Sequence, residues 1–264
     1  MKDKQIERPV ENIVNLSGGK DSTAMLLLML EHNIPIDDIL FLDTGVEFPE
    51  IYNHLNKLEE YTGRKITRLS SDKDFTYYMT EYVRKKGPNK GRSGYGWPRS
   101  RSRWCTSLLK QERASAYLRG RNVIQIIGIA ADEAHRFKKG KFRYPLIEYG
   151  FTEAKALKYC YDHGFTWGGL YEKMDRVSCY LCPLADLRAK KVVFDEYPDL
   201  WAHMKFLDDA SMKYGWKFRK DYSLRQLEER FKLEDEFVAA GKSIRKREFF
   251  EELRHRFAVL GYYE

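Results

Sequence analysis

Residues 12–22 have the sequence NIVNLSGGKDS, and this stretch decides the fold. The apolar run 12–16 is short, as is typical of a strand buried on both faces of a parallel sheet. Gly18 and Gly19 follow it, and both can adopt positive φ and let the backbone approach a ligand closely. From Ser22 the sequence turns apolar and predicts a helix to about His32. The stretch therefore predicts a strand, a glycine turn and a helix.

The same alternation continues along the chain. The sequence predicts a strand at 39–42, a helix at 49–62 with a proline at its start, a strand at 65–69 and a strand at 122–129. Strands that alternate with helices indicate βαβ units, so we expect an α/β protein with a parallel, Rossmann-like sheet.

The remaining segments differ in character from this alternation. Residues 87–103 are rich in Gly, Ser, Pro and Arg and predict a long exposed loop. Further helices are predicted at 106–118, 152–163 and 248–260, and the chain is helical and highly charged after Cys182. We expect a nucleotide-binding domain over 1–185 and a helical C-terminal extension over 186–264.

The composition favours a soluble globular protein, because 43% of the 264 residues are hydrophobic and 33% are charged. No apolar run approaches the roughly 18 residues that a membrane span needs. Residues 1–10 are charged and lack the apolar core of a signal peptide. We therefore expect a cytoplasmic protein with no membrane partner.

Much of the net charge of +8 arises from one segment, residues 84–121, which holds twelve Lys or Arg and a single acid, Glu112. Such a run is commonly a solvated face, but it also suits a polyanion such as a nucleotide or a nucleic acid backbone. Tyr95, Trp97 and Trp104 interleave with its arginines. This mixture predicts stacking and phosphate contacts on tRNA or DNA, or a lid over a nucleotide.

The six residues from Ser17 to Ser22 have the chemistry of an anion site. Backbone N–H groups of a glycine turn and of the following helix start can surround a phosphate. Lys20 supplies a positive charge and Ser22 a hydroxyl donor, whereas Asp21 suits Mg²⁺ or the orientation of Lys20. The spacing is not that of a Walker A loop. The alternative interpretation is an ordinary turn between strand and helix.

The string SGGKDS resembles the signature of the PP-loop ATP pyrophosphatase superfamily, which has the adenine nucleotide alpha hydrolase fold. The resemblance implies that ATP is held by its pyrophosphate end and that AMP is transferred to a substrate oxygen. It assigns pyrophosphate contacts to Lys20 and Ser22, and close backbone approach to Gly18 and Gly19. Ser17 and Asp21 are counted with them as nucleotide-binding residues.

More of the chain is similar to the phosphoadenosine phosphosulfate reductase family, a branch of that superfamily. The matching stretches are DTGVEFPE at 43–50, RWCT at 103–106, GIAADEAHR at 128–136, and LY at 170–171 followed by CYLCP at 179–183. Alanines at 130 and 134 replace the usual Arg and Ser. Asp43, Glu133 and Arg136 follow predicted strand ends, where open α/β sheets bind ligands. This position suits Asp43 to Mg²⁺ or ribose, Glu133 to the nucleotide, and Arg136 to neutralising charge as a catalytic residue beside Lys20 and Asp21. The alternatives are a turn residue before Gly45 for Asp43 and plain surface charges for Glu133 and Arg136.

The sequence departs from the reductases in one respect. Those enzymes attack sulfur with a cysteine of a C-terminal Glu-Cys-Gly-Leu-His tail, whereas no cysteine follows Cys182 here. We therefore expect ATP-dependent adenylylation rather than reduction of a sulfated nucleotide.

The four cysteines are Cys105, Cys160, Cys179 and Cys182. By resemblance to tRNA-thiolating relatives, Cys105, Cys179 and Cys182 would hold a [4Fe–4S] cluster with one open iron. A sulfur donor protein would then be a partner. A structural zinc is the alternative. We interpret Cys160 as a small buried apolar residue.

Three hypotheses follow from the sequence. The first is an ATP-dependent adenylylating sulfurtransferase that acts on a nucleic acid or a small anion. The second is a reductase of adenylyl sulfate or its 3′-phosphorylated form. The third is a non-catalytic module that binds a nucleotide or nucleic acid and carries a structural zinc.

Overall fold

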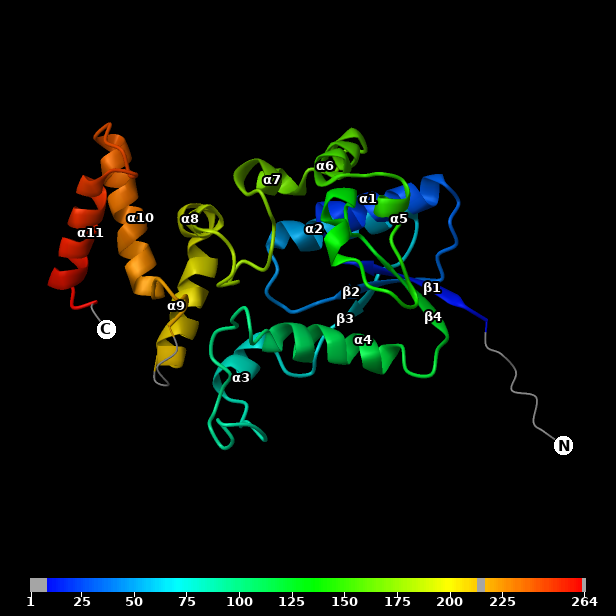
Figure 1. The fold of residues 1–264 in the computed structure, drawn as a ribbon, viewed down its shortest axis with the longest axis horizontal. Helices are drawn as coiled ribbons and strands as arrows, with labels where there is room; N and C mark the ends of the chain where they lie inside the picture. The colour runs from blue at the N-terminus through cyan, green and yellow to red at the C-terminus, as the bar shows by residue number, and fades with distance from the viewer. Residues whose placement is uncertain (1–8, 213–216, 263–264) are drawn as a thin grey trace. The chain divides into compact units, whose positions relative to one another are not determined.

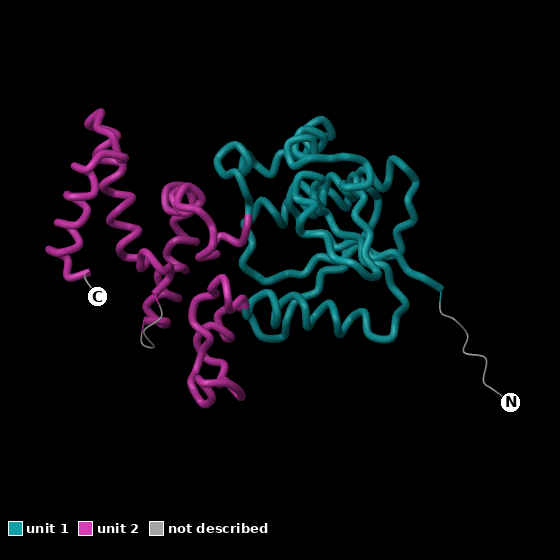
Figure 2. The backbone as a smooth tube through the Cα atoms, in the orientation of Figure 1, with its two compact units in different colours: residues 1–74, 104–177 teal, residues 75–103, 178–264 magenta. Residues whose placement is uncertain are grey.

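The computed structural model describes residues 9–212 and 217–262, so the charged residues 1–8 lie outside the described part. The chain forms two compact units, each built from two stretches of sequence (Figure 2). Unit 1 comprises Met1–Asp74 and Trp104–Val177, and unit 2 comprises Phe75–Arg103 and Ser178–Glu264. The predicted domain boundary between residues 185 and 186 stays a prediction.

Unit 1 contains a five-stranded sheet in the order β3-β2-β1-β4-β5, and every pairing in it is parallel. This confirms the α/β class. Helices cover both faces of the sheet: α1, α5 and α6 lie over one face and α4 over the other (Figure 1). This coverage explains why the central strands are nearly continuous apolar runs. The strand bounds are β1 Glu11–Leu16, β2 Asp38–Leu42, β3 Thr67–Leu69, β4 Val123–Ile127 and β5 Phe142–Arg143.

The helices of unit 1 follow the predicted alternation. Helix α1 is apolar around most of its circumference, because it lies between the sheet and the neighbouring helices. The predicted helix at 106–118 divides into a π-helical segment, η1, and a short α4. The bounds are α1 Lys20–Glu31, α2 Pro49–Thr62, η1 Thr106–Gln111, α4 Glu112–Tyr117, η2 Ala131–Arg136, α5 Pro145–Glu148, α6 Glu153–Asp162, η3 Trp167–Gly169 and α7 Leu170–Lys173.

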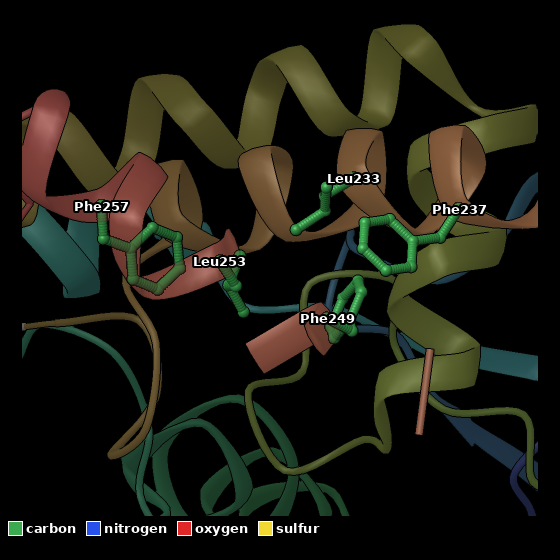
Figure 3. Packing of buried hydrophobic residues seen from close by; sticks show 5 residues of the cluster. All are labelled: Leu233, Phe237, Phe249, Leu253 and Phe257. Carbon is green, nitrogen blue, oxygen red and sulfur yellow. The ribbon is translucent and has the colours of Figure 1, made fainter. Parts of the chain in front are cut away.

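Unit 2 is helical, and two of its helices form a hairpin. Its helices are α3 Phe75–Thr80, α8 Leu187–Glu196, α9 Pro198–Met212, α10 Leu224–Ala239 and α11 Arg247–Val259. Five buried side chains join α10 to α11: Leu233, Phe237, Phe249, Leu253 and Phe257 (Figure 3). The predicted amphipathic helix at 248–260 therefore uses its apolar side to close this hairpin.

The predicted exposed loop at 87–103 is wrong for its central part. Gly94 has φ +68°, and a Cβ there would lie 2.2 Å from the carbonyl oxygen of Met79, so the chain packs against α3 at this point. Trp97 is 2% exposed, and its Nε1 donates to Asp208 Oδ1 at 2.7 Å. The segment is thus folded into unit 2 by close backbone packing, by backbone hydrogen bonds from Gly94, Tyr95 and Gly96 to residues 78–82, and by the buried hydrogen bond of Trp97.

Within residues 9–212 and 217–262, no helix is both long enough and apolar enough to cross a membrane.

Candidate functional site

The strand order places the glycine turn at the switch point of the sheet, where the chain stops adding strands on one side of β1 and begins to add them on the other side. Strand β2 pairs with one edge of β1, and β4 pairs with the other. In open α/β sheets, ligands bind outside the carboxyl ends of the two strands at such a switch point. The carboxyl end of β1 leads into Ser17, and that of β4 leads into Gly128. A Cβ on Gly128 would lie 2.9 Å from the Cα and N of Ser22, so the backbone that follows β4 packs directly against the first turn of α1.

Residues 17–22 form a tight turn whose shape depends on Gly18. Gly18 has φ +77°, and a Cβ there would lie 2.9 Å from Ile51 Cγ2. The indole of Trp167 donates to the Gly18 carbonyl oxygen at 2.7 Å, and this bond is buried. Gly19 has φ −86° and extended backbone, so the prediction that both glycines adopt positive φ is wrong for Gly19. Its Cα is instead crowded, because a Cβ would lie 3.1 Å from Tyr171 Oη.

Side-chain oxygens satisfy several amides of the turn. Ser22 Oγ accepts from the N–H of Ser17 at 3.1 Å and donates to the carbonyl of Gly19 at 3.1 Å. The N–H of Lys20 donates to Tyr171 Oη at 2.8 Å. Such N–H groups are the donors that bind phosphate at helix N-termini. A bound phosphate would therefore replace contacts that the protein makes within the turn.

The ammonium group of Lys20 lies between two carboxylates. Its Nζ donates to Glu153 Oε2 at 2.5 Å and to Asp21 Oδ2 at 3.2 Å. Burial lowers the pKa of Lys20, but the hydrogen bond to Glu153 and the charges of both acids raise it by more, so the pKa lies above its ordinary value. Lys20 is therefore a fixed positive charge at neutral pH.

Asp21 has an oxygen that is available for a cation. Its Oδ1 is buried and has no hydrogen-bond partner among the described residues. Burial raises the pKa of Asp21 above its ordinary value, against the opposing effect of Lys20. A buried carboxylate oxygen without a donor fits a hard cation such as Mg²⁺, which prefers oxygen ligands. The predicted role of Asp21 toward Mg²⁺ therefore fits its surroundings.

The other predicted nucleotide residues lie at strand ends of unit 1. Asp43 directly follows β2, and its Oδ1 accepts from the N–H of Gly45 and from Tyr52 Oη, each at 2.8 Å. Glu133 and Arg136 lie in η2 after β4 and form an ion pair with each other. The charge of Arg136 is thus balanced by Glu133.

The cysteines divide between the two units. Cys160 is fully buried in α6, as predicted, and its Sγ donates to the Lys20 carbonyl at 3.4 Å. Burial raises its pKa to about 12, so it stays a neutral thiol. Cys105 belongs to unit 1, whereas Cys179 and Cys182 belong to unit 2. No three His, Cys, Asp or Glu side chains gather in a metal-binding arrangement in the part of the chain that the structure describes.

The Cys179–Cys182 turn is supported by buried cations of unit 2. The N–H of Cys182 donates to the Cys179 carbonyl at 3.0 Å, and Lys190 Nζ donates to the Tyr180 carbonyl at 2.5 Å. Lys190 is 1% exposed. Burial lowers its pKa to about 8, although the nearby Cys182 and Cys179 act in the opposite direction. The turn therefore has a defined shape within unit 2.

The basic segment 84–121 also divides between the units, and its two parts differ. In unit 1, Lys110 pairs with Glu47 and Arg121 pairs with Glu11, so these charges are used within the fold. In unit 2, six exposed cations make no ion pair with any other described residue. They are Lys85, Lys86, Lys90, Arg92, Arg101 and Arg103.

The predicted aromatic stacking surface is wrong for two of its three residues. Trp97 and Trp104 are 2% and 6% exposed, so neither ring is available to a base or a nucleotide. Tyr95 is half-buried and stacks on Tyr82, with ring centroids 5.3 Å apart. The tryptophan side chains are buried because each has a large apolar surface, and removing that surface from water stabilises the fold. The arginines around them stay exposed.

Sequence reasoning gave no role to three residues that contact the turn: Glu153, Trp167 and Tyr171. In the sequence, Glu153 has the pattern of an acidic residue in the first turn of a helix, which needs no functional explanation. Its hydrogen bond to Lys20 joins residues that lie 133 positions apart. Tyr171 lies in a matched motif but carried no assigned contact. These contacts depend on tertiary structure, and only the motif around Tyr171 offered a signal.

Fold and turn together define a nucleotide-binding α/β protein. Comparison with known families matches residues 11–193 to the phosphoadenosine phosphosulfate reductase domain. The chain belongs to this family, a nucleotide-binding branch of the PP-loop superfamily.

Two curated relatives are uncharacterized proteins of Methanocaldococcus jannaschii. MJ0066 is 28% identical over 81% of this chain and 45% of its own length. MJ0973 is 26% identical over 78% of this chain and 51% of its own length. The chain therefore spans about half the length of the curated relatives it matches.

The imidazole of His54 supports the turn from inside unit 1. Its Nε2 lies 2.8 Å from Thr23 Oγ1, and its ring stacks on Trp167 with centroids 4.5 Å apart. Burial lowers the pKa of His54 from 6.5 to about 3, and the charge of Lys57 adds to this effect. His54 is therefore neutral in the folded protein well below pH 6.5.

We predict that His54 makes the protein sensitive to acid. Because its pKa is lower when folded than when unfolded, the unfolded chain takes up the proton first as the pH falls. Stability is fully present above pH 6.5 and is lost toward pH 3, with a slope of up to about 1.4 kcal/mol per pH unit from this group. Urea unfolding of wild type and His54→Gln across this range measures the effect. Equal slopes in both proteins would contradict it.

Proposed function

We propose that this protein is an ATP pyrophosphatase that adenylylates an acceptor. One observation carries the proposal: a buried lysine and the amides of a glycine turn lie at the switch point of the sheet, where nucleotides bind. Turn amides and Lys20 would hold the β- and γ-phosphates. An acceptor oxygen would attack the α-phosphorus, the bond between the α-phosphorus and the bridging oxygen would break, and pyrophosphate would leave.

Each polar group of the turn has a task in this reaction. Lys20 and the N–H groups would stabilise the charge that develops on the departing pyrophosphate, which is the kind of interaction that accelerates phosphoryl and nucleotidyl transfer. Ser22 would donate its hydroxyl hydrogen bond to a phosphate oxygen. Asp21 would hold a Mg²⁺ ion at its buried oxygen, and the ion would supply further positive charge there.

The acceptor that we propose is a nucleic acid. The support is the set of six exposed cations in residues 85–103 that no described acid neutralises. Phosphate backbones bind such clusters by release of counter-ions. The alternative acceptor is a small anionic metabolite.

An anaerobic pyrophosphate-release screen tests the proposal. ATP is supplied with tRNA, with DNA or with small anions, and release is expected with one acceptor class. Release of sulfite from a sulfated nucleotide, without pyrophosphate, would favour a reductase instead. Tight ATP binding without any turnover would favour a non-catalytic module.

The finer proposal is sulfur transfer to the adenylylated acceptor. Its support is the family resemblance together with the spacing of Cys179 and Cys182. Two thiols of unit 2 do not complete the ligand set of an iron–sulfur cluster or of a tetrahedral zinc site, so we derive no chemical step through a metal. Cys105 is the proposed third ligand.

Metal analysis of anaerobically purified protein decides this finer proposal. We expect iron and acid-labile sulfide in the wild type, and loss of both in Cys179→Ser and Cys182→Ser. Cys160→Ser is the matched control and should retain both, since its neutral thiol is committed to the Lys20 carbonyl. Detection of zinc without sulfide would mean that these cysteines hold a structural zinc ion and not an iron–sulfur cluster.

A further inference from the structure

The phosphate turn has an excess of negative charge. Two carboxylates, from Asp21 and Glu153, surround one ammonium group, and Lys20 is only 8% exposed. A bare phosphate that entered the turn would therefore meet a net charge of its own sign, and such repulsion is strong where water is partly excluded. One of the two carboxylates must be released or be neutralised before a polyphosphate can bind Lys20.

The backbone of Glu153 is fixed by hydrogen bonds, whereas its side chain is partly exposed to water. It is the first residue of α6, and its N–H donates to Asp132 Oδ1 at 3.1 Å. Thr152 caps the helix by accepting from the N–H of Lys155. Farther along the helix, Cys160 donates to the Lys20 carbonyl, so α6 is attached to the turn at both ends. The Glu153 side chain is nevertheless 42% exposed and can turn into water without unfolding the helix.

Asp21 lacks this freedom. Its side chain is 23% exposed, it belongs to α1 next to Lys20, and one of its oxygens is buried. The Asp21 side chain therefore has less access to water than the Glu153 side chain. Of the two carboxylates, Glu153 is therefore the one that can be exchanged.

We propose that Glu153 is a specificity-determining residue: it is the exchangeable counter-ion of Lys20, and it makes the turn favour metal-complexed polyphosphate over the bare anion. A bare anion must displace the carboxylate from Lys20 against its charge. A metal-complexed anion carries positive charge of its own, so the carboxylate opposes it less. This inference rests on the proposed function of the turn as a polyphosphate site.

Titration calorimetry with inorganic pyrophosphate tests the inference, once in EDTA and once in Mg²⁺. We expect Glu153→Gln to bind bare pyrophosphate about tenfold more tightly than wild type. The ratio of affinities with and without Mg²⁺ should shrink accordingly. Glu148→Gln is the matched control, because it removes an acid of unit 1 that pairs with Arg143 and not with Lys20; it should match wild type.

A stability measurement separates this role from a structural one. Glu153→Gln should melt at a lower temperature than wild type, since it leaves the buried Lys20 with one charged partner fewer. If Glu153→Gln binds bare pyrophosphate more tightly although it is less stable, damage to the fold does not explain the result. Should this variant not fold, Glu153→Asp withdraws the carboxylate by one methylene and should bind bare pyrophosphate more tightly than wild type, by a smaller factor.

The outcomes are distinguishable. If wild type binds pyrophosphate and the Glu153 variants bind the bare anion equally or more weakly, the exchange is overturned and the proposed function stands. If neither wild type nor any variant binds pyrophosphate or ATP, with or without Mg²⁺, the proposed function itself fails.

Discussion

Lys20→Ala is expected to reduce pyrophosphate release from ATP by about 100-fold or more, the usual cost of removing one donor that stabilises transition-state charge. Lys20 supplies the buried ammonium group at the start of α1, where it lies between the carboxylates of Asp21 and Glu153. Without it, both carboxylates would face the phosphates directly. Steady-state release of pyrophosphate with the active acceptor measures the effect.

Lys158→Ala is the control for this variant. Lys158 is exposed on α6 and pairs with Asp162, so its removal changes the net charge equally without touching the turn. It should retain wild-type activity. If Lys20→Ala were as active as Lys158→Ala, the turn would not be the site of pyrophosphate binding.

Gly128→Ala is expected to weaken ATP binding by up to about 100-fold, because overpacking costs about 1–3 kcal/mol and each 1.4 kcal/mol is about a factor of ten in affinity. The added Cβ would lie 2.9 Å from the backbone of Ser22. Backbone cannot rotate away as a side-chain end can, so the first turn of α1 must move away from residue 128. Binding of ATP followed by calorimetry measures the loss.

Two glycine variants bracket this prediction. In Gly19→Ala the new methyl meets the hydroxyl of Tyr171 at 3.1 Å, which can shift, so the loss of affinity should be smaller. Gly150→Ala places a methyl in open space and should leave affinity unchanged, although its φ of +64° costs some stability. Equal affinities in Gly128→Ala and Gly150→Ala would mean that the contact between Gly128 and the first turn of α1 does not shape the site.

The fold could be predicted because its signals are local. Strands covered on both faces consist of short apolar runs, and residues 12–16 and 39–42 show them plainly. Helix α2 begins at Pro49, as expected from the proline, and it ends at Thr62, where Gly63 follows in the left-handed conformation. The glycine turn could be located for the same reason, since its residues are consecutive.

The surroundings of the turn could not be predicted, because they come from distant parts of the chain. Tyr171 and Trp167 contact it from about 150 residues away. The matched motif at 170–171 indicated that Tyr171 belongs to the family pattern but not what it contacts, and the sequence around Trp167 gave no signal. Trp97 likewise depends on a partner in α9, Asp208. Local composition marked that segment as an exposed loop, whereas tertiary packing buries its centre.

The most direct test of the central claim is to identify which bond of ATP is broken. Phosphorus NMR of a reaction with ATP, Mg²⁺ and the active acceptor identifies every phosphorus-containing product. Cleavage at the α-phosphorus predicts pyrophosphate together with AMP, free or attached to the acceptor, and neither product with Lys20→Ala. Formation of ADP and inorganic phosphate would contradict the claim, as would intact ATP in a protein that releases sulfite from a sulfated adenine nucleotide.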